Sequence, residues 1–350
     1  MHIYGRNWKR RELEARVGKI ETIGGVRRFR IEDGPEHGVE LIQVRNGAGL
    51  TYYLNASRAL DISLAEYRGV PLSWHSVNGD VHPAYYNPDG TEWSRTAAGG
   101  LLMTCGLTQV GSPCQDGEDK LGIHGRIHHT PTRDVSAYGF WDGDDYHMQI
   151  RGIMQESRIF AENMQLTREI KTRLGENKIV IHDTVENIGF QTTPFMILYH
   201  FNFGFPLMTE NTIIEFPSHQ VIPRDQHIPV DGFDRWQTPE VNYQERVYYH
   251  QIDQAKVNDN LATVYIRNSS FPIEAGNGKI PVTVRLAWNI DNLPNLIQWK
   301  MPAAGVYALG IEPANCHVEG RVAERNNKTL IMLEPGESKH YYLELEIVEE

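Results

Sequence analysis

The sequence predicts an all-β protein built as one large antiparallel β-sandwich. Apolar and polar residues alternate in short segments from the first quarter of the chain to its last ten residues, and such alternation is typical of half-buried strands. Turn sequences rich in Gly, Pro, Asn and Asp separate these segments. Helical periodicity is scarce. Many strands, regular turns and few helices together favour a sandwich or a barrel.

Seven segments alternate clearly enough to be predicted as strands. They cover residues 26–31, 40–44, 148–153, 166–170, 178–185, 282–288 and 341–348. The turns predicted between strands lie at 32–35, 87–90, 141–143, 175–177, 276–278 and 334–337. One short helix is predicted over residues 8–17, where the periodicity is compatible with a helix or an irregular lead-in.

Two stretches lack clear alternation and are predicted as loops. Residues 74–131 are rich in Gly, Pro, His and aromatic side chains, and residues 216–239 form a second loop-rich stretch. Loops that a rigid scaffold holds in place often carry function, so we expect functional residues on the longer stretch. No Ser/Gly linker or block of charge divides the chain. We therefore expect residues 1–350 to form a single domain, with residues 1–25 as an N-terminal extension.

Composition and charge exclude several classes of partner. The 350 residues carry a net charge of -11, which repels phosphate backbones, so no nucleic acid is expected. No apolar run is long enough to cross a membrane, and no apolar segment of the secretory type follows the basic start. The three cysteines show no metal-ligand or redox spacing, so we expect reduced thiols and a cytoplasmic protein. Cys105 lies in an apolar run and is read as a buried, inert thiol.

Two distant segments place a proton-transfer group in an otherwise apolar run. His200 follows 194–199, and alternation puts it on the same strand face as Asn202. It is either a hydrogen-bonded core histidine or, with Asn202, part of a site whose polar groups a bound polyol would satisfy. Glu312 follows 305–311. It is either the partner of a buried Arg or Lys, or a general base whose pKa burial raises.

A third segment, residues 122–126, sets His124 beside Arg126 in a turn flanked by glycines. His128 and His129 follow at once. No carboxylate or Cys stands at ligand spacing, so we expect no metal here and read His128 and His129 as exposed loop residues.

Other polar and aromatic residues allow two interpretations each. Arg58 either pairs with Asp61 at a strand end or donates hydrogen bonds to sugar hydroxyls. Trp74, Trp93 and Trp299 are either core residues or stacking faces for a sugar ring.

Over residues 58–336 the chain resembles the aldose 1-epimerase (galactose mutarotase-like) superfamily, and within it the DUF4432 branch. The resemblance is carried by the segments 58–62, 99–107, 122–126, 183–187, 198–204, 298–300 and 310–315. It implies a large twisted β-sandwich, the galactose mutarotase-like supersandwich, with the sugar in an open cleft.

The resemblance also implies roles for three residues. His124 matches the family histidine that contacts the sugar, His200 matches the general acid, and Glu312 matches the general base. The aspartate with which the family binds sugar has no matching motif here, and the candidates are Asp225, Asp231 and Asp234. The arginine motif of galactose mutarotases is absent from its usual place, where Arg126 or Arg58 is the candidate substitute.

The function that follows is interconversion of sugar anomers by ring opening and closure, with Glu312 as base and His200 as acid. No cofactor and no metal are expected, and the partner is a monosaccharide or a sugar derivative. The expected substrate-binding residues are Arg58, His124, Arg126, Asn202, Gln298 and Lys300. The cations among them also allow an acidic or keto-modified sugar. Two alternatives stay open: an isomerase or lyase that acts on such a sugar with the same His/Glu pair, and a carbohydrate sensor without activity. The sequence does not indicate an oligomeric state.

Overall fold

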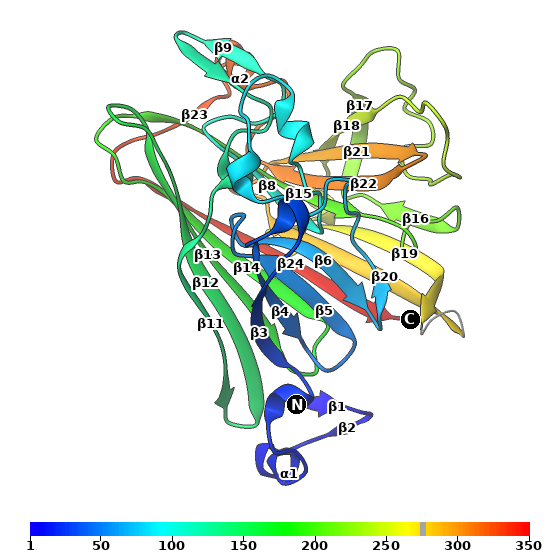
Figure 1. The fold of residues 1–350 in the computed structure, drawn as a ribbon. Coiled ribbons are helices and arrows are strands. Elements are labelled where there is room, and N and C mark those ends of the chain that lie inside the picture. Colours follow the sequence, from blue (N-terminus) through cyan, green and yellow to red (C-terminus); the bar gives the residue numbers. More distant parts are fainter. Residues whose placement is uncertain (274–277) are drawn as a thin grey trace.

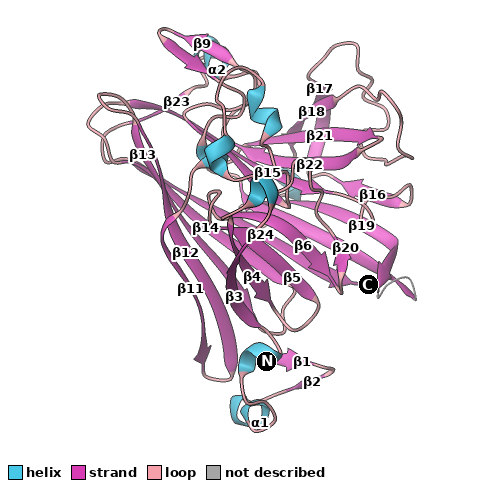
Figure 2. Cartoon of the chain, viewed as in Figure 1, coloured by secondary structure: helices cyan, strands magenta, loops and turns pink. Residues whose placement is uncertain are grey.

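The computed structural model describes residues 1–273 and 278–350. Two large antiparallel sheets face each other and contain most of the chain (Figures 1 and 2). The all-β sandwich predicted from the sequence is therefore confirmed.

The larger sheet has twelve strands and carries the candidate site. Its order is β17 (Ser218–Pro223), β18 (Arg246–Ile252), β21 (Asn295–Ala303), β22 (Val306–Ala314), β15 (Thr193–Phe203), β8 (Leu102–Leu107), β6 (Asp61–Tyr67), β5 (Leu50–Asn55), β4 (Glu40–Arg45) and β3 (Gly25–Arg30), with β23 (Ile331–Leu333) paired to β15 and β7 (Val70–Pro71) paired to β6.

The second sheet has eight strands. Its order is β11 (Arg133–Asp142), β12 (Asp145–Ser157), β13 (Asn163–Arg173), β14 (Lys178–Asn187), β24 (Ser338–Glu349), β20 (Gly278–Asn289), β19 (Leu261–Ile273) and β16 (Thr212–Glu215). Most of these strands alternate buried and partly exposed residues, because one face packs in the core and the other meets water.

Small elements lie at the two ends of the sandwich in Figure 1. At one end are β1 (His2–Ile3), β2 (Arg6–Asn7) and the helix α1 (Arg10–Glu14); at the other are β9 (Cys114–Asp116), β10 (Asp119–Leu121) and the helix α2 (Arg321–Asn327). Short 3-10 helices cover Ile20–Thr22, Gly34–Glu36, Pro83–Tyr85, Glu92–Arg95, Ile127–His129 and Gln254–Lys256. Ile3 and Leu13 are buried in the main core, so the N-terminal segment packs onto the sandwich.

The seven strands predicted from alternation are confirmed as β3, β4, β12, β13, β14, β20 and β24, and the predicted helix over 8–17 contains α1. Residues 276 and 277 of the turn predicted at 276–278 lie outside the described residues. Both predicted loop stretches contain strands, which corrects the prediction. β8, β9 and β10 lie within 74–131, and β8 is buried at every position, so it shows no alternation. β17 lies within 216–239 at the sheet edge.

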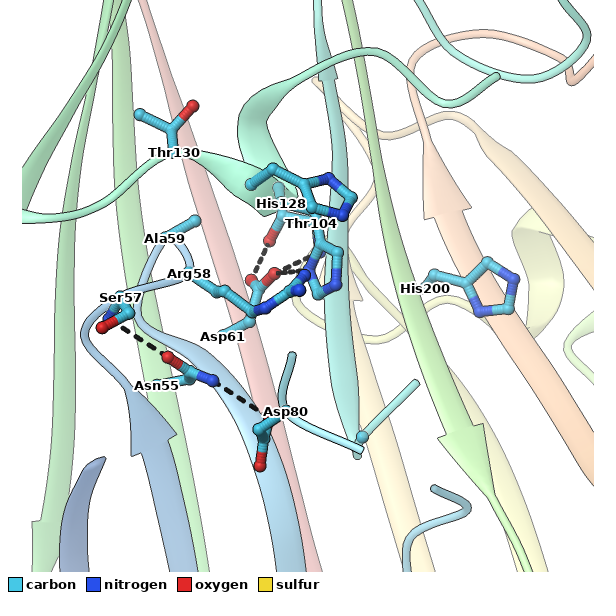
Figure 3. Close-up of polar contacts among 12 residues, drawn as sticks. Asn55, Ser57, Arg58, Ala59, Asp61, Asp80, Thr104, His128, Thr130 and His200 are labelled. Carbon is cyan, nitrogen blue, oxygen red and sulfur yellow. Dashed lines mark hydrogen bonds and ion pairs between the residues drawn. The ribbon is translucent and has the colours of Figure 1, made fainter. Parts of the chain in front are cut away.

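A buried network of polar side chains connects the two sheets. Arg168 on β13 donates to Asp183 at 2.7 Å and to Asp61 on β6 at 2.8 Å. It also donates to the Thr104 hydroxyl on β8 at 2.8 Å. Asp61 accepts from that hydroxyl and lies 2.7 Å from Nδ1 of His128 (Figure 3). The partner of Asp61 is thus Arg168 and not Arg58.

His128 and His129 are 3% and 6% exposed, which corrects their prediction as exposed loop residues. The sequence misled because their partners come from distant segments. His128 bonds Asp61, and His129 stacks on the ring of Tyr86 at 4.0 Å and bonds the hydroxyl of Thr96.

Candidate active site

The centre of the site is a pair of side chains on adjacent strands of the larger sheet. In the register of β15 and β22, Leu198 pairs with Ala314 and Phe201 with Ile311, which sets His200 opposite Glu312. Side chains directly opposite on one face of an antiparallel pair lie in contact. Nε2 of His200 accordingly lies 3.1 Å from Oε1 of Glu312. The two residues, 112 positions apart in the sequence, form one buried pair in close polar contact.

β15 explains why polar groups can be placed here. Its odd-numbered residues from Phe195 to Phe203 pack into the core between the sheets. Met196 and Leu198, on the opposite face, pack into a second apolar cluster with Met103, Cys105 and Ile297. His200 and Asn202 continue that opposite face. Because loops cover this face, the strand is buried on both sides and its end closes one wall of a cavity.

Gly310 allows the pair to pack closely against its strand. A Cβ at this position would lie 2.8 Å from Oε1 of Glu312, 2.8 Å from Cβ of Trp299 and 3.0 Å from Cε1 of His200. Real Cβ atoms essentially never make contacts under 3.0 Å. A side chain at position 310 would therefore displace Glu312 or Trp299 and disturb the pair.

The pair lines a cavity of about 570 Å³, a size typical of small-molecule sites. Aromatic rings form an arc around it. The successive ring centroids of Trp93, His124, His200, Trp299 and Trp74 are 5.2, 6.1, 5.7 and 5.7 Å apart. Valine, methionine and isoleucine side chains complete a mainly apolar wall. Such a wall suits the C–H faces of a sugar ring, with polar groups at a few fixed points.

His124 enters the cavity from the loop that follows β10. Its φ of 56° is in the left-handed region, and its backbone is fixed by hydrogen bonds to Gly111 and from Gly106. Nδ1 of the ring accepts a long hydrogen bond of 3.4 Å from the N–H of Gly111. This arrangement directs the other ring nitrogen away from the loop backbone.

Several buried polar atoms around the cavity have no partner in the part of the chain that the structure describes. They are Nδ1 of His200, Oδ1 of Asn202 and Nε1 of Trp93. The Nδ2 group of Asn202 donates to the carbonyls of Gly100 and His200, which fixes the amide. Buried polar atoms normally have partners. A polar ligand or water would satisfy these three.

Burial changes the protonation of the central pair. It raises the pKa of Glu312 to about 8, with a smaller contribution from the charge of Glu245, and it lowers the pKa of His200 to about 3. Burial also lowers the pKa of His124 to about 4. At neutral pH the Glu312–His200 pair therefore holds one proton and no net charge.

The structure brings together four of the residues predicted for the site: His124, His200, Asn202 and Glu312 all line the cavity. The three tryptophans line it as well. The remaining four, Arg58, Arg126, Gln298 and Lys300, lie outside its walls.

The two arginines among these four residues lie in other parts of the structure. Arg58 is buried, donates to the carbonyl of Val81 and lies near Asp61 and His128, away from His200 in Figure 3. Arg126 is exposed and borders a separate polar hollow beside Glu156. Since each cation or amide is held elsewhere, none of the four is placed for direct contact with a ligand in the cavity.

Gln298 and Lys300 support a loop. Nζ of Lys300 donates to the carbonyls of Gly232 and Arg235 at 2.5 and 2.7 Å. Gln298 donates to the carbonyl of Phe233 at 2.7 Å. Both side chains are almost fully buried, so they fix the loop from below.

The sequence did not single out Arg224, Glu245 or Gly310. Arg224 and Glu245 line the cavity, and they are joined by an ion pair of 3.2 Å. Asp225 pairs with Arg224, and neither Asp225, Asp231 nor Asp234 lines the cavity. No motif marked Arg224 or Glu245, since their proximity arises only when the flanking strands β17 and β18 pair.

The described residues hold neither a cluster of metal ligands nor a membrane-spanning helix. No group of three or more His, Cys, Asp or Glu side chains is arranged to hold a metal ion in residues 1–273 and 278–350. No helix in the same residues is long and apolar enough to span a membrane.

A model of the family described as domain of unknown function DUF4432 matches residues 36–347. No curated protein matches the sequence.

Solved structures with the same fold include a candidate aldose 1-epimerase of Klebsiella pneumoniae, with a TM-score of 0.82, 23% identity and coverage of 92% of this chain and 83% of that one. A galactose 1-epimerase of Lactobacillus acidophilus matches with a TM-score of 0.57, 12% identity and coverage of 93% and 98%. A candidate aldose 1-epimerase of Escherichia coli matches with a TM-score of 0.57, 12% identity and coverage of 93% of this chain and 100% of that one.

Proposed function

The chain belongs to the DUF4432 family, and from this premise and the geometry of the cavity we propose that it interconverts the anomers of a sugar by acid–base catalysis. The observation that carries the proposal is the contact of 3.1 Å between His200 and Glu312 at the wall of an aromatic-lined cavity. The fold shared with aldose 1-epimerase-like structures supports it but fixes no activity.

The pair has the single proton that the reaction needs. Transfer of this proton from Glu312 to His200, across their contact of 3.1 Å, gives a carboxylate and an imidazolium. The carboxylate then removes the proton of the anomeric hydroxyl while the imidazolium protonates the ring oxygen, and the C1–O5 bond breaks. Both oxygens belong to the same carbon, so adjacent acid and base can reach them. After rotation about C1–C2, the reverse transfers close the ring on the other face.

The remaining residues of the cavity orient the sugar. The ring of His124 and the amide of Asn202 are held by backbone contacts, which reduces the entropy that binding would cost. Gly310, which has no Cβ, lets Glu312 and His200 lie close to the strand backbone without a clash.

Anomer exchange measured by NMR tests the proposal. We expect the protein to accelerate exchange between the α and β signals of D-glucose or D-galactose in proportion to protein concentration. Exchange at the rate in buffer alone, with the sugar bound, would contradict the proposal and favour a carbohydrate sensor. Incorporation of solvent deuterium at a ring carbon would instead favour an isomerase or lyase.

The pH dependence follows from the two shifted pKa values. A carboxylate normally limits activity on the acid side and an imidazole on the basic side. Burial reverses the order of the two groups. His200 takes up a second proton for the pair only far below neutral pH, whereas Glu312 loses the pair's titratable proton near pH 8. We expect kcat/KM for anomer exchange to be level around neutral pH and to fall above about pH 8. A rate that rises steadily from pH 8 to pH 10 would contradict this assignment.

A further inference from the structure

The charges at the cavity bear on which sugar can enter. Arg224 is the one Arg or Lys side chain on the cavity wall among the described residues. It follows β17 directly, and Glu245 directly precedes β18, so the two stand at the neck of the loop 224–245. The N–H of Arg224 donates to the carbonyl of Val247 at 2.8 Å, which closes the neck.

The cation is already paired with two carboxylates. Nη1 of Arg224 lies 3.2 Å from Oε1 of Glu245, and Nη2 and Nε lie 2.8 and 3.1 Å from Oδ2 of Asp225. Recognition of a phosphate or carboxylate group needs an Arg or Lys free to make charge-assisted hydrogen bonds. This guanidinium is already paired, and the three side chains together carry a net negative charge beside the cavity.

The same pair suits hydroxyl groups. Three hydrogen bonds leave Arg224 with two of its five N–H groups. Glu245 uses only Oε1 in the described contacts, and its side chain is 47% exposed. A donor and an acceptor thus stand side by side facing the cavity. Neighbouring hydroxyls of a sugar, each of which both donates and accepts, match that arrangement.

Hydrogen bonds hold the middle of the loop in place. Besides Lys300 and Gln298, which hold the carbonyls of Gly232, Phe233 and Arg235, the hydroxyl of Tyr248 donates to the carbonyl of Pro229 at 3.1 Å. Because the middle of the loop is held and the Arg224–Val247 hydrogen bond closes its neck, little ordering of the loop is needed when a ligand binds.

We propose that Arg224 and Glu245 determine substrate specificity: they bind two adjacent hydroxyls of a neutral sugar and exclude phosphorylated and acidic sugars. The inference rests on the proposed function for its site, and it departs from the acidic or keto-modified sugar that the sequence allowed. The cations that suggested such a sugar, Arg58, Arg126 and Lys300, lie outside the cavity walls.

Binding measurements test this without reference to turnover. Isothermal titration with D-glucose, D-galactose and D-mannose, with their uronic acids and with their 6-phosphates gives the affinity for each charge class. We expect at least one neutral sugar to bind, and its uronate and 6-phosphate to bind about ten-fold more weakly or worse. Glu245→Gln removes a negative charge and weakens the hold on Nη1 of Arg224, while Asp225 keeps its two hydrogen bonds to the guanidinium. It should weaken binding of the neutral sugar about ten-fold and narrow the difference between neutral and anionic sugars.

Glu346→Gln is the matched control, because it removes the same charge from an ion pair with Arg285 on the other sheet, and it should change neither affinity. Tighter binding of a uronate or phosphate by the wild type, an unchanged ratio in Glu245→Gln, or binding of none of the nine compounds would overturn the inference. Selective binding of neutral sugars without anomer exchange would support this inference and contradict the proposed function. Anomer exchange with a preference for anionic sugars would contradict this inference and support the proposed function.

Discussion

Replacing Glu312 with Gln is expected to slow anomer exchange by roughly 10²- to 10⁴-fold, the usual contribution of a positioned acid–base group. Gln keeps the shape of Glu and can still bond Nε2 of His200, which lies 3.1 Å from Oε1 in the wild type. It cannot accept a proton from the anomeric hydroxyl. The loss should therefore fall on kcat, with the dissociation constant of the sugar nearly unchanged. Exchange spectroscopy and titration of the same samples measure the two quantities.

His200→Asn is the companion variant and should lose a similar factor, because the acid and the base act as one unit. His124→Ala contrasts with both, since His124 orients the sugar, and it should mainly weaken binding. The melting temperature of each variant, compared with that of the wild type, shows whether the variant is still folded. The raised pKa of Glu312 means that its carboxyl stabilises the fold fully below its unfolded pKa and loses that contribution as pH rises toward 8. Glu312→Gln should thus be as stable as the wild type or more so at pH 8. Equal exchange rates in the wild type and in Glu312→Gln would contradict the assignment of Glu312 as the base.

The sequence predicted the eight-stranded sheet better than the twelve-stranded one. Strands such as β12 and β13 have one face in the core and one toward water, so apolar and polar residues alternate along their sequence. β8 is buried on both faces and reads as a uniform apolar run. Burial on both faces also helped to predict the site. A polar residue such as Glu312 in an apolar run is costly to bury, which indicates either a partner or a function.

Charge alone did not tell which polar residues face the cavity. Lys300 and Gln298 are buried, as a binding residue can be, but their partners are backbone carbonyls of a loop far away in the sequence. Arg224 and Glu245 stand in a stretch without motif or alternation. Their ion pair depends on the pairing of β17 with β18, and no local pattern records that register. The partner of a polar side chain therefore depends on how distant segments pair in the fold, and the local sequence does not predict it.

Arg168 is expected to be the most sensitive single position for stability. Arg168→Met should lower the free energy of unfolding by about 3–5 kcal/mol, the cost of leaving buried charges without their partner. Arg168 is fully buried, and it bonds Asp183 on β14, Asp61 on β6 and Thr104 on β8. Although burial alone would lower the pKa of Arg168, the charge of Asp183 raises it. The guanidinium is therefore fixed in its charged form, and Met fills its volume without its charge.

Urea unfolding at pH 7 measures the effect, and Arg285→Met is the matched control. Arg285 pairs with Glu346 at 2.8 Å, but its side chain is 42% exposed. An exposed pair contributes little, so this control should lose less than about 1 kcal/mol. Asp61 keeps the hydrogen bonds from Thr104 and His128 in Arg168→Met. Asp183, among the residues that the structure describes, keeps only the hydrogen bond from the hydroxyl of Tyr199. Adding Asp183→Asn to Arg168→Met should accordingly recover part of the loss, because it removes the orphaned charge. A loss in Arg168→Met as small as that in Arg285→Met would show that the network does not hold the two sheets together.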